Sequence, residues 1–247
     1  MRKATSALIL AAFHIALAQQ TKPPFIREFK WPTPPGSTFP VTAWEKVTPE
    51  SANYSSAKLD ALRVWLKTQH TTGMQVVVSG RVLFEYGDIT QVSKIASVRK
   101  SILGMLPGNY VVGGKINLQK TVKELGLEDV NKFLPIEEQA TLQNLIMSRS
   151  GIYLKADPNA PRKGSQTPGA LFYYNNWDFN AAGTAFERLT GRNIFDALET
   201  DLARPIGLED YDRKKQKKIQ TVPDKLISVH PEYAMYLSTR DMARRAC

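Results

Sequence analysis

Two β-rich runs joined by a short turn, MQVVVSGRVLFEYGD (residues 74–88), constrain the fold more than any other feature of the sequence. The runs meet at Ser79, Gly80 and Arg81, and a short link containing glycine favours an antiparallel hairpin. Most of the helical patterns follow this hairpin, without regular alternation of strands and helices. Strands early and helices later predict an α+β fold rather than a parallel α/β fold.

Helical periodicity marks a segment before the hairpin and several after it. In the first segment, Leu59, Leu62, Trp65 and Leu66 share one stripe, and Ser55 or Ser56 is the expected N-cap. A helix is also expected from Ser97, and Pro107-Gly108 should end or kink it. Three later helices are predicted: TLQNLIMSRSG, capped by Thr141 and stopped near Gly151; WDFNAAGTAFERLTG, ending at Gly191; and NIFDALETDLARPIG, stopped at Pro205–Gly207.

The N-terminal residues 1–18 have the pattern of a signal peptide. Arg2 and Lys3 precede the apolar run ALILAAFHIALA, and Ala16 and Ala18 are the small residues that signal peptidase reads. The run is short for a membrane span, and a buried N-terminal helix is the alternative. We expect cleavage after Ala18 and export, to the periplasm or the medium. No cysteine follows the cleavage site, so we expect no lipid anchor.

Beyond the signal peptide we expect a lead-in, residues 19–50, and one domain, residues 51–247. The lead-in is punctuated by prolines, which exclude a helix and predict an extended segment lying over the surface. The single cysteine, Cys247, allows no internal disulfide, so the domain must rely on its core. A composition of 43% hydrophobic and 23% charged residues is that of an ordinary globular protein.

The net charge of +10 is densest in RKKQKK, residues 213–218. A solvated loop explains this cluster most simply. The alternative is weak contact with an anionic envelope polymer or with lipid headgroups, made by the cluster's cations. These cations are Arg213, Lys214, Lys215, Lys217 and Lys218. Nucleic acid is not an expected partner, because the protein is predicted to be exported and the cluster has no interleaved aromatic residues.

The sequence lacks the motifs of several common kinds of binding site and active site. The histidines are His14, His70 and His230, and they have no spacing typical of metal ligands. There is no phosphate-binding P-loop, no G-x-G-x-x-G and no G-x-S-x-G. Neither His70 nor His230 has a context that favours a Ser-His-Asp triad. We therefore expect no metal and no organic cofactor.

Two S-x-x-K pairs remain as candidates for nucleophile and base, Ser97–Lys100 and Ser55–Lys58. At a spacing of three residues, the lysine of a helix can reach a serine hydroxyl at its start. The N-terminal end also favours negative charge that develops on the serine oxygen. To act as a base, the lysine must be neutral. An apolar helix follows Ser97–Lys100 and would bury it, whereas Ser55–Lys58 opens a charged, surface-type helix.

A second candidate motif is the Y-x-N formed by Tyr174 and Asn176, on the loop before a predicted helix. A tyrosine hydroxyl held by cations can transfer protons, and an asparagine amide can orient a lysine and a substrate carbonyl. The alternative is that Tyr173, Tyr174 and Trp177 are only core aromatic residues at the start of that helix.

Taken in order, these motifs resemble the serine β-lactamase and penicillin-binding-protein superfamily, most closely the class C β-lactamase-related serine hydrolases. ASVRKS resembles the nucleophile segment and YNN the Y-x-N motif. The resemblance implies Ser97 as nucleophile, Lys100 as its base, Tyr174 as general acid/base and Asn176 as a substrate-positioning residue. It also implies a β-lactamase/transpeptidase-like fold, with an antiparallel sheet flanked by helices and a helical subdomain. LQNLIMSRSGIY, the region NAAGTAFERLTGRNIFDALETDLARPIGLED and YLSTRDMAR resemble further family segments.

The third motif of this superfamily, K-T-G or H-x-G, has no counterpart after YLSTRDMAR. We therefore expect a chain that is truncated at its C-terminus and lacks the last strands of the sheet. The resemblance implies a hydrolase that forms an acyl-enzyme on an ester or amide: an esterase, a D-amino-acid peptidase or a β-lactamase-like enzyme. The alternative is a non-catalytic remnant, or a protein that binds the envelope or peptidoglycan.

Overall fold

The computed structural model describes residues 35–40, 43–154, 158–220 and 228–246, so the predicted signal peptide and much of the lead-in lie outside the described residues. The predicted hairpin is confirmed: β1 (Gly73–Val78) pairs antiparallel with β2 (Arg81–Gly87). Its turn residues, Ser79 and Gly80, have φ of 49° and 79°. A two-residue turn with both φ values positive matches the twist of the strands that it joins.

The described part of the lead-in runs along the hairpin. Val82 donates its backbone N–H to the carbonyl of Glu45 at 2.8 Å, and Val47 donates to the carbonyl of Val82 at 3.0 Å. Thr38 donates to the carbonyl of Ser79 at 3.0 Å. These bonds cover the outer edge of β2, which would otherwise expose unpaired backbone groups.

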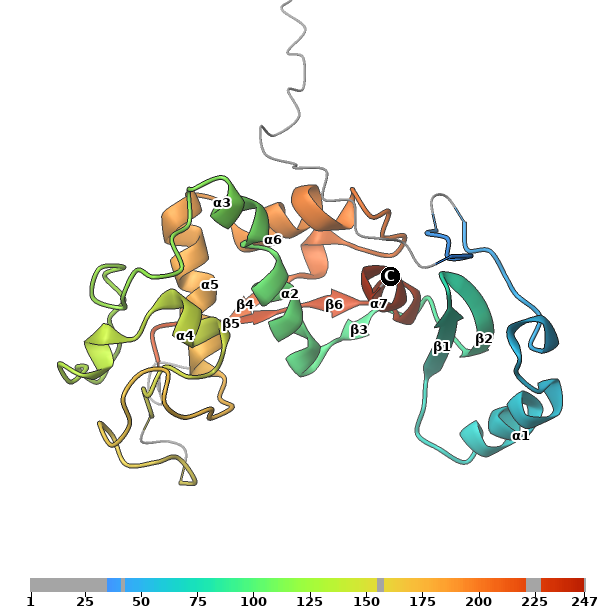
Figure 1. The fold of residues 1–247 in the computed structure, drawn as a ribbon, viewed down its shortest axis with the longest axis horizontal. Helices are drawn as coiled ribbons and strands as arrows, with labels where there is room; N and C mark the ends of the chain where they lie inside the picture. Colours follow the sequence, from blue (N-terminus) through green and yellow to red (C-terminus); the bar gives the residue numbers. More distant parts are fainter. Residues whose placement is uncertain (1–34, 41–42, 155–157, 221–227, 247) are drawn as a thin grey trace, which may run out of the picture.

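The remaining strands form two short antiparallel pairs, β3 (Ser93–Lys94) with β6 (Tyr236–Leu237) and β4 (Lys217–Ile219) with β5 (Glu232–Ala234). The described strands thus make three two-stranded sheets. Figure 1 shows the short strands in the middle of the molecule, with α5 on one side and the β1–β2 hairpin on the other. Helices therefore flank antiparallel strands, as the predicted fold class requires.

The helices of the described ranges are unequal in length, and two of them exceed ten residues. They are α1 (Ser56–Leu66), α2 (Arg99–Met105), α3 (Gly108–Val112), α4 (Leu142–Ile146), α5 (Trp177–Thr190), α6 (Ile194–Leu198) and α7 (Thr239–Ala246). A π-helical turn, Glu199–Ala203, continues α6. Short 3-10 turns lie at Glu50–Ala52, Ala96–Val98, Glu137–Gln139 and Arg213–Lys215.

The predicted ends of three helices are confirmed. α5 stops at Gly191, whose φ of 69° is the left-handed conformation that a glycine C-cap supplies. α6 and its π-helical turn stop before Pro205. Pro107 separates α2 from α3 and is the N-cap of the latter, so the chain does bend there.

Two details of the helix predictions were wrong. Thr141 caps α4 as expected, within a capping box shared with Asn144, but the helix ends at Ile146 rather than near Gly151. Ser148 follows with a φ of 52°, which turns the chain out of the helix. In α1, the side chain of Trp65 is 56% exposed although periodicity placed it on the buried stripe. α1 covers only the small hairpin, which is too narrow to bury the whole stripe.

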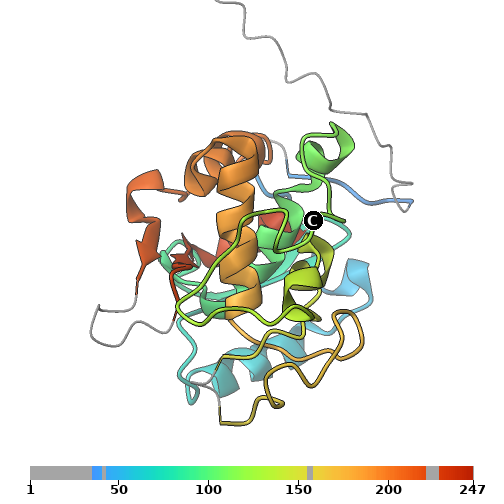
Figure 2. The same ribbon diagram turned by 90° about the vertical axis from the view of Figure 1, so that its left-hand side faces the viewer.

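The main core surrounds α5. Its buried residues Ala181, Ala185 and Phe186 pack with residues from α2, α4, α6 and the central strands. Figure 2 shows α5 standing in front of α2 and the central strands. The small side chains of α5 permit close approach, and at Gly183 an added Cβ would lie 2.4 Å from the ring of Tyr233. The helix and β5 are therefore in contact at the atomic level.

Gly183→Ala should destabilise the protein by about 1–3 kcal/mol, because the new methyl group overlaps a buried ring that has no room to move. Gly104→Ala is the matched control: it is also a helical glycine, but its added Cβ would meet Ile146 at 3.8 Å, an ordinary contact. That variant should be neutral or more stable by about 0.5–1 kcal/mol. Urea unfolding measures both, and equal effects would contradict this account of the contact.

Candidate active site

Ser97 lies in a short turn that leads into α2. The turn is the 3-10 segment Ala96–Val98, and the side chain of Ser97 is exposed. Ala96 has a φ of 45°, a conformation that residues other than glycine, asparagine and aspartate seldom adopt. Strained backbone of this kind is concentrated at functional sites. Here it places Ser97 at the surface of the molecule while Lys100, three residues later, is buried.

Lys100 connects the two predicted motifs. Its Nζ lies 3.2 Å from Oγ of Ser97, 2.7 Å from the hydroxyl of Tyr174 and 2.8 Å from Oδ1 of Asn176. A lysine ammonium has three N–H donors, and each has an acceptor here. The structure thus brings together all four site residues predicted from the sequence, although their roles stay predictions.

Tyr174 and Asn176 reach Lys100 from the loop that leads into α5. Asn176 is the N-cap residue of that helix, and the N–H of Tyr173 anchors the loop by donating to the carbonyl of Ser148 at 2.9 Å. The hydrogen bond from Lys100 is the main cause that lowers the pKa of the Tyr174 phenol. A hydrogen bond with Ser97 and the positive charges of Lys100 and Arg99 lower it further. The phenol of Tyr174 therefore loses its proton more readily than an ordinary tyrosine does.

The second S-x-x-K pair has a different role. The hydroxyl of Ser55 accepts the backbone N–H of Lys58 at 3.4 Å and is the N-cap of α1. Both side chains are exposed on the surface. Ser55 is therefore a capping residue of α1, and the same spacing serves a structural purpose here.

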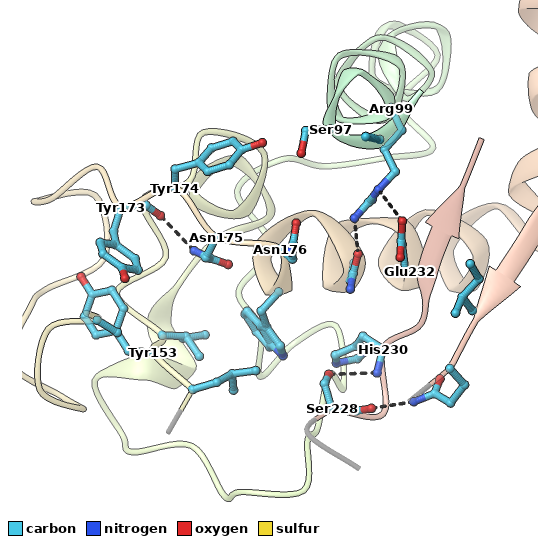
Figure 3. A pocket seen from close by; sticks show the side chains of 18 of the residues that line it. Ser97, Arg99, Tyr153, Tyr173, Tyr174, Asn175, Asn176, Ser228, His230 and Glu232 are labelled. Carbon is cyan, nitrogen blue, oxygen red and sulfur yellow. Dashed lines mark hydrogen bonds and ion pairs between the residues drawn. The ribbon is translucent and has the colours of Figure 1, made fainter. Parts of the chain in front are cut away.

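A cavity of about 670 Å³ opens beside Ser97. Figure 3 shows Ser97 and Tyr174 at one side of it, Tyr153 and Tyr173 along another, and Ser228, His230 and Glu232 opposite. Its wall thus combines aromatic rings with polar side chains, as is usual for small-molecule sites. Within the described ranges, no group of three or more His, Cys, Asp or Glu side chains could hold a metal ion.

The cavity also contains a charged group that sequence analysis did not single out. Arg99 is buried, donates from Nη2 to Oδ1 of Asn180 at 2.9 Å, and lies 3.8 Å from the carboxylate of Glu232. Lys94 pairs with the same carboxylate at 2.9 Å. Asn180 could have been found by its spacing, because it lies one helical turn after Asn176. Glu232 comes from a distant strand and has no such signal.

His230 also lines the cavity, although sequence analysis set it aside. Its Nδ1 is 3.1 Å from the hydroxyl of Thr184, and its ring meets that of Trp177 edge to face. Asp129 stabilises this wall by accepting hydrogen bonds from Trp177, from the hydroxyl of Ser228 and from the N–H of Val229. Burial lowers the pKa of His230, which keeps the imidazole neutral.

The profile of the Beta-lactamase family matches residues 62–245, which is most of the chain. This protein belongs to the β-lactamase family. The match confirms the resemblance to the serine β-lactamase and penicillin-binding-protein superfamily. No curated protein matches the chain in sequence.

Solved structures of this family share the fold. A protein assigned as a 6-aminohexanoate-dimer hydrolase from Bacillus anthracis has a TM-score of 0.58 and 18% identity, over 84% of this chain and 63% of its own. D-alanine carboxypeptidase AmpC from Burkholderia cenocepacia has a TM-score of 0.55 and 16% identity, over 77% and 64%. SurE with D-Leu has a TM-score of 0.54 and 18% identity, over 78% and 52%. The chain spans between about half and two thirds of the length of these proteins.

Beneath the Tyr174 loop of this β-lactamase family member lies a buried acid. Asp178 is fully buried, and burial raises the pKa of its carboxyl to about 7, although hydrogen bonds with Ser150 and Asn175 act in the opposite direction. In the unfolded chain an aspartate ionises near pH 4. Folding therefore keeps a proton on Asp178 over about three pH units in which the unfolded chain releases it.

Asp178→Asn should remove this pH dependence. Because the folded pKa is raised, the stability associated with Asp178 is complete below about pH 4 and is lost as the pH rises to about 7. Over this window the free energy of unfolding of the native protein should fall, relative to that of the variant, by on the order of 4 kcal/mol. Urea unfolding at pH 4–8 measures the difference. If the difference between the two free energies of unfolding does not change with pH, the raised pKa of Asp178 is contradicted.

Proposed function

We propose that this protein is an exported serine hydrolase that forms an acyl-enzyme on an ester or amide. The observation that carries the proposal is the contact of the Lys100 ammonium with Ser97, Tyr174 and Asn176. A serine, a base within hydrogen-bond reach and a third group that orients the base are the parts of an activated nucleophile. Membership of the β-lactamase family supports the same reaction class.

In acylation, the oxygen of Ser97 attacks the substrate carbonyl while its proton passes to Lys100. Lys100 already contacts the hydroxyl of Tyr174 at 2.7 Å, so the proton can continue to the tyrosine without movement of either side chain. This transfer requires that Lys100 and Tyr174 together hold one proton fewer than the fully protonated pair. The lowered pKa of Tyr174 favours that state.

The tetrahedral intermediate collapses when the bond to the leaving group breaks. Tyr174 donates the proton to the leaving oxygen or nitrogen, and the acyl group stays on Ser97. In deacylation, water attacks the acyl carbon, gives its proton to the same pair, and Ser97 recovers its hydrogen. Asn176, bound to Lys100 at 2.8 Å, holds the ammonium in position and has an amide N–H₂ that can bind a substrate carbonyl.

The substrate class is supported by the names of structurally similar proteins. These include a class C β-lactamase in complex with cefoxitin, a D-alanine carboxypeptidase and the 6-aminohexanoate-dimer hydrolase. Amide bonds are the common target that these names imply. We propose a broad esterase or peptidase-like activity rather than a dedicated β-lactamase.

A fluorophosphonate probe should add once to the purified protein, as measured by intact mass, and Ser97→Ala should abolish the adduct. The matched control is Ser55→Ala, which removes the serine of the other S-x-x-K pair. This control should label at the native rate and lose only about 1 kcal/mol of stability, because Ser55 is a helix cap.

Two results would contradict the hydrolase proposal. One is labelling that survives Ser97→Ala. The other is a folded native protein that forms no adduct, which would favour the alternative of a non-catalytic remnant or an envelope-binding protein. Such a protein would keep the cavity beside Ser97 without forming a covalent bond.

Export is proposed from residues 1–18, which lie outside the described residues. None of the helices in the described ranges has the length and apolar composition that a membrane span needs. Expression of the full chain in a bacterium should yield a mature protein that begins at Gln19, as read by N-terminal sequencing of the periplasmic fraction and the medium. Recovery of only the uncleaved chain, from the cytoplasm, would contradict export.

The proposed contact with an anionic envelope surface now falls on fewer residues. Arg213 pairs with Asp196 at 2.6 Å and Lys218 with Glu187 at 2.5 Å. Lys214, Lys215 and Lys217 are exposed. A surface of three lysines supports at most a weak contact, which salt would screen.

A further inference from the structure

Asp178 occupies an unusual position in the first turn of α5. Its side chain is fully buried, and Oδ1 lies 2.6 Å from the hydroxyl of Ser150. The other oxygen, Oδ2, has no hydrogen-bond partner among the described residues. An ionised carboxylate in this place would bury a charge that hydrogen bonds with Ser150 and Asn175 offset only in part, whereas a protonated carboxyl buries none.

The contacts of Asp178 reach the loop that carries the site. Its backbone N–H donates to Oδ1 of Asn175 at 2.8 Å, and Nδ2 of Asn175 donates to the carbonyl of Tyr173 at 3.0 Å. These bonds fix the residues on both sides of Tyr174. Figure 3 shows Asn175 and its bond to Tyr173 directly beneath Tyr174.

Asp178 also holds a second loop. The hydroxyl of Ser150 that contacts its carboxyl accepts the backbone N–H of Ile152 at 3.0 Å. Ile152 and the adjacent Tyr153 line the cavity. Asp178 therefore connects the segment that carries Tyr174 and Asn176, through its backbone N–H, with the part of the wall that carries Ile152 and Tyr153, through its carboxyl.

Among the described residues, no cation pairs with this carboxyl. α4 contributes no charged residue, and Arg149, beside Ser150, is exposed. On α2, the ammonium of Lys100 is occupied by its three acceptors, and Arg99 is held by Asn180 and Glu232. Within the described ranges, Tyr153 is the titratable group on which the charge of this carboxyl acts. Burial and the charge of Asp178 raise the pKa of Tyr153, so this neighbour is a neutral phenol.

We propose that Asp178 is a positioning residue that holds the Tyr174–Asn176 loop against Lys100 only while its carboxyl is protonated. The proposal rests on the proposed function. When the carboxyl is protonated, it keeps its hydrogen bond with Ser150 and the buried region contains no charge. When it ionises, Oδ2 needs a donor that the folded site does not offer, and the loop must open to admit water. The reaction of Ser97 then slows because Tyr174 and Asn176 leave Lys100.

The test is the rate at which the fluorophosphonate probe labels Ser97 between pH 5.5 and 8.5, in the native protein and in Asp178→Asn. Asparagine has the shape of the protonated acid but does not titrate. The ratio of the variant rate to the native rate cancels any pH dependence that the two proteins share. It should be close to one at pH 5.5 and reach about tenfold at pH 8, because each pH unit above a pKa lowers the protonated fraction tenfold.

A ratio that stays constant with pH would overturn the proposal, since a merely structural aspartate changes the rate equally at every pH. Asp60→Asn is the matched control: it makes the same chemical change on the exposed surface of α1 and should give a ratio of one throughout. If Asp178→Asn does not fold, Ser150→Ala replaces it. That variant removes a bond that lowers the pKa of Asp178, so the fall in rate should move to higher pH. If the labelling rate of Ser150→Ala falls at the same pH as that of the native protein, the proposal is contradicted.

A second measurement does not depend on activity. The backbone amide of Tyr173 donates to the carbonyl of Ser148, and opening of the loop breaks this bond. Hydrogen exchange of that amide, corrected for its intrinsic pH dependence, should accelerate above about pH 7 in the native protein and not in Asp178→Asn. If exchange of the Tyr173 amide accelerates as expected but Ser97 is not labelled, only the hydrolase proposal is overturned. If Ser97 is labelled normally but the exchange does not accelerate, only the role of Asp178 is overturned.

Discussion

The arrangement of the site depends on one ammonium group. Lys100 is buried at the start of α2, and a buried cation is tolerated only if its donors are satisfied. Its three acceptors come from two segments that are more than seventy residues apart in the sequence. The need to satisfy this charge therefore holds the loop before α5 against the turn that carries Ser97. The oxygen atoms of the proposed active site are thus the same atoms that make burial of Lys100 possible.

Much of the local structure could be predicted from the sequence. The hairpin followed from two β-rich runs and the turn at Ser79-Gly80, and the end of α5 followed from Gly191, because each depends on the conformational preference of a few adjacent residues. The end of α4 did not, since the residues after Ile146 suit a helix. The chain leaves it because the peptide after Ser148 bonds elsewhere, to the N–H of Tyr173. Such a contact cannot be seen in a local pattern.

The same distinction applies to the site. Ser97, Lys100, Tyr174 and Asn176 belong to short motifs whose spacing carries chemical meaning, so they could be named in advance. Glu232, His230 and Asp178 have no such motif. Glu232 and His230 reach the cavity because the strand β5 and the segment before it pack against α5, which is a property of the tertiary fold. Asp178 has the appearance of an ordinary acidic residue in a first helical turn, a place where carboxylates are common, and only its complete burial sets it apart.

The contact between Tyr233 and Gly183 has a consequence for how such a cavity can change. Successive residues of a strand point to opposite sides, so Tyr233 enters the core while Glu232, its neighbour, faces the cavity. The tyrosine ring rests on the bare backbone of α5, and the acidic side chain next to it lies beside Arg99 and Lys94. A substitution in the interior that displaces Tyr233 is therefore expected to displace Glu232 as well. The charges of the cavity wall can in this way change although no residue that lines the cavity is altered.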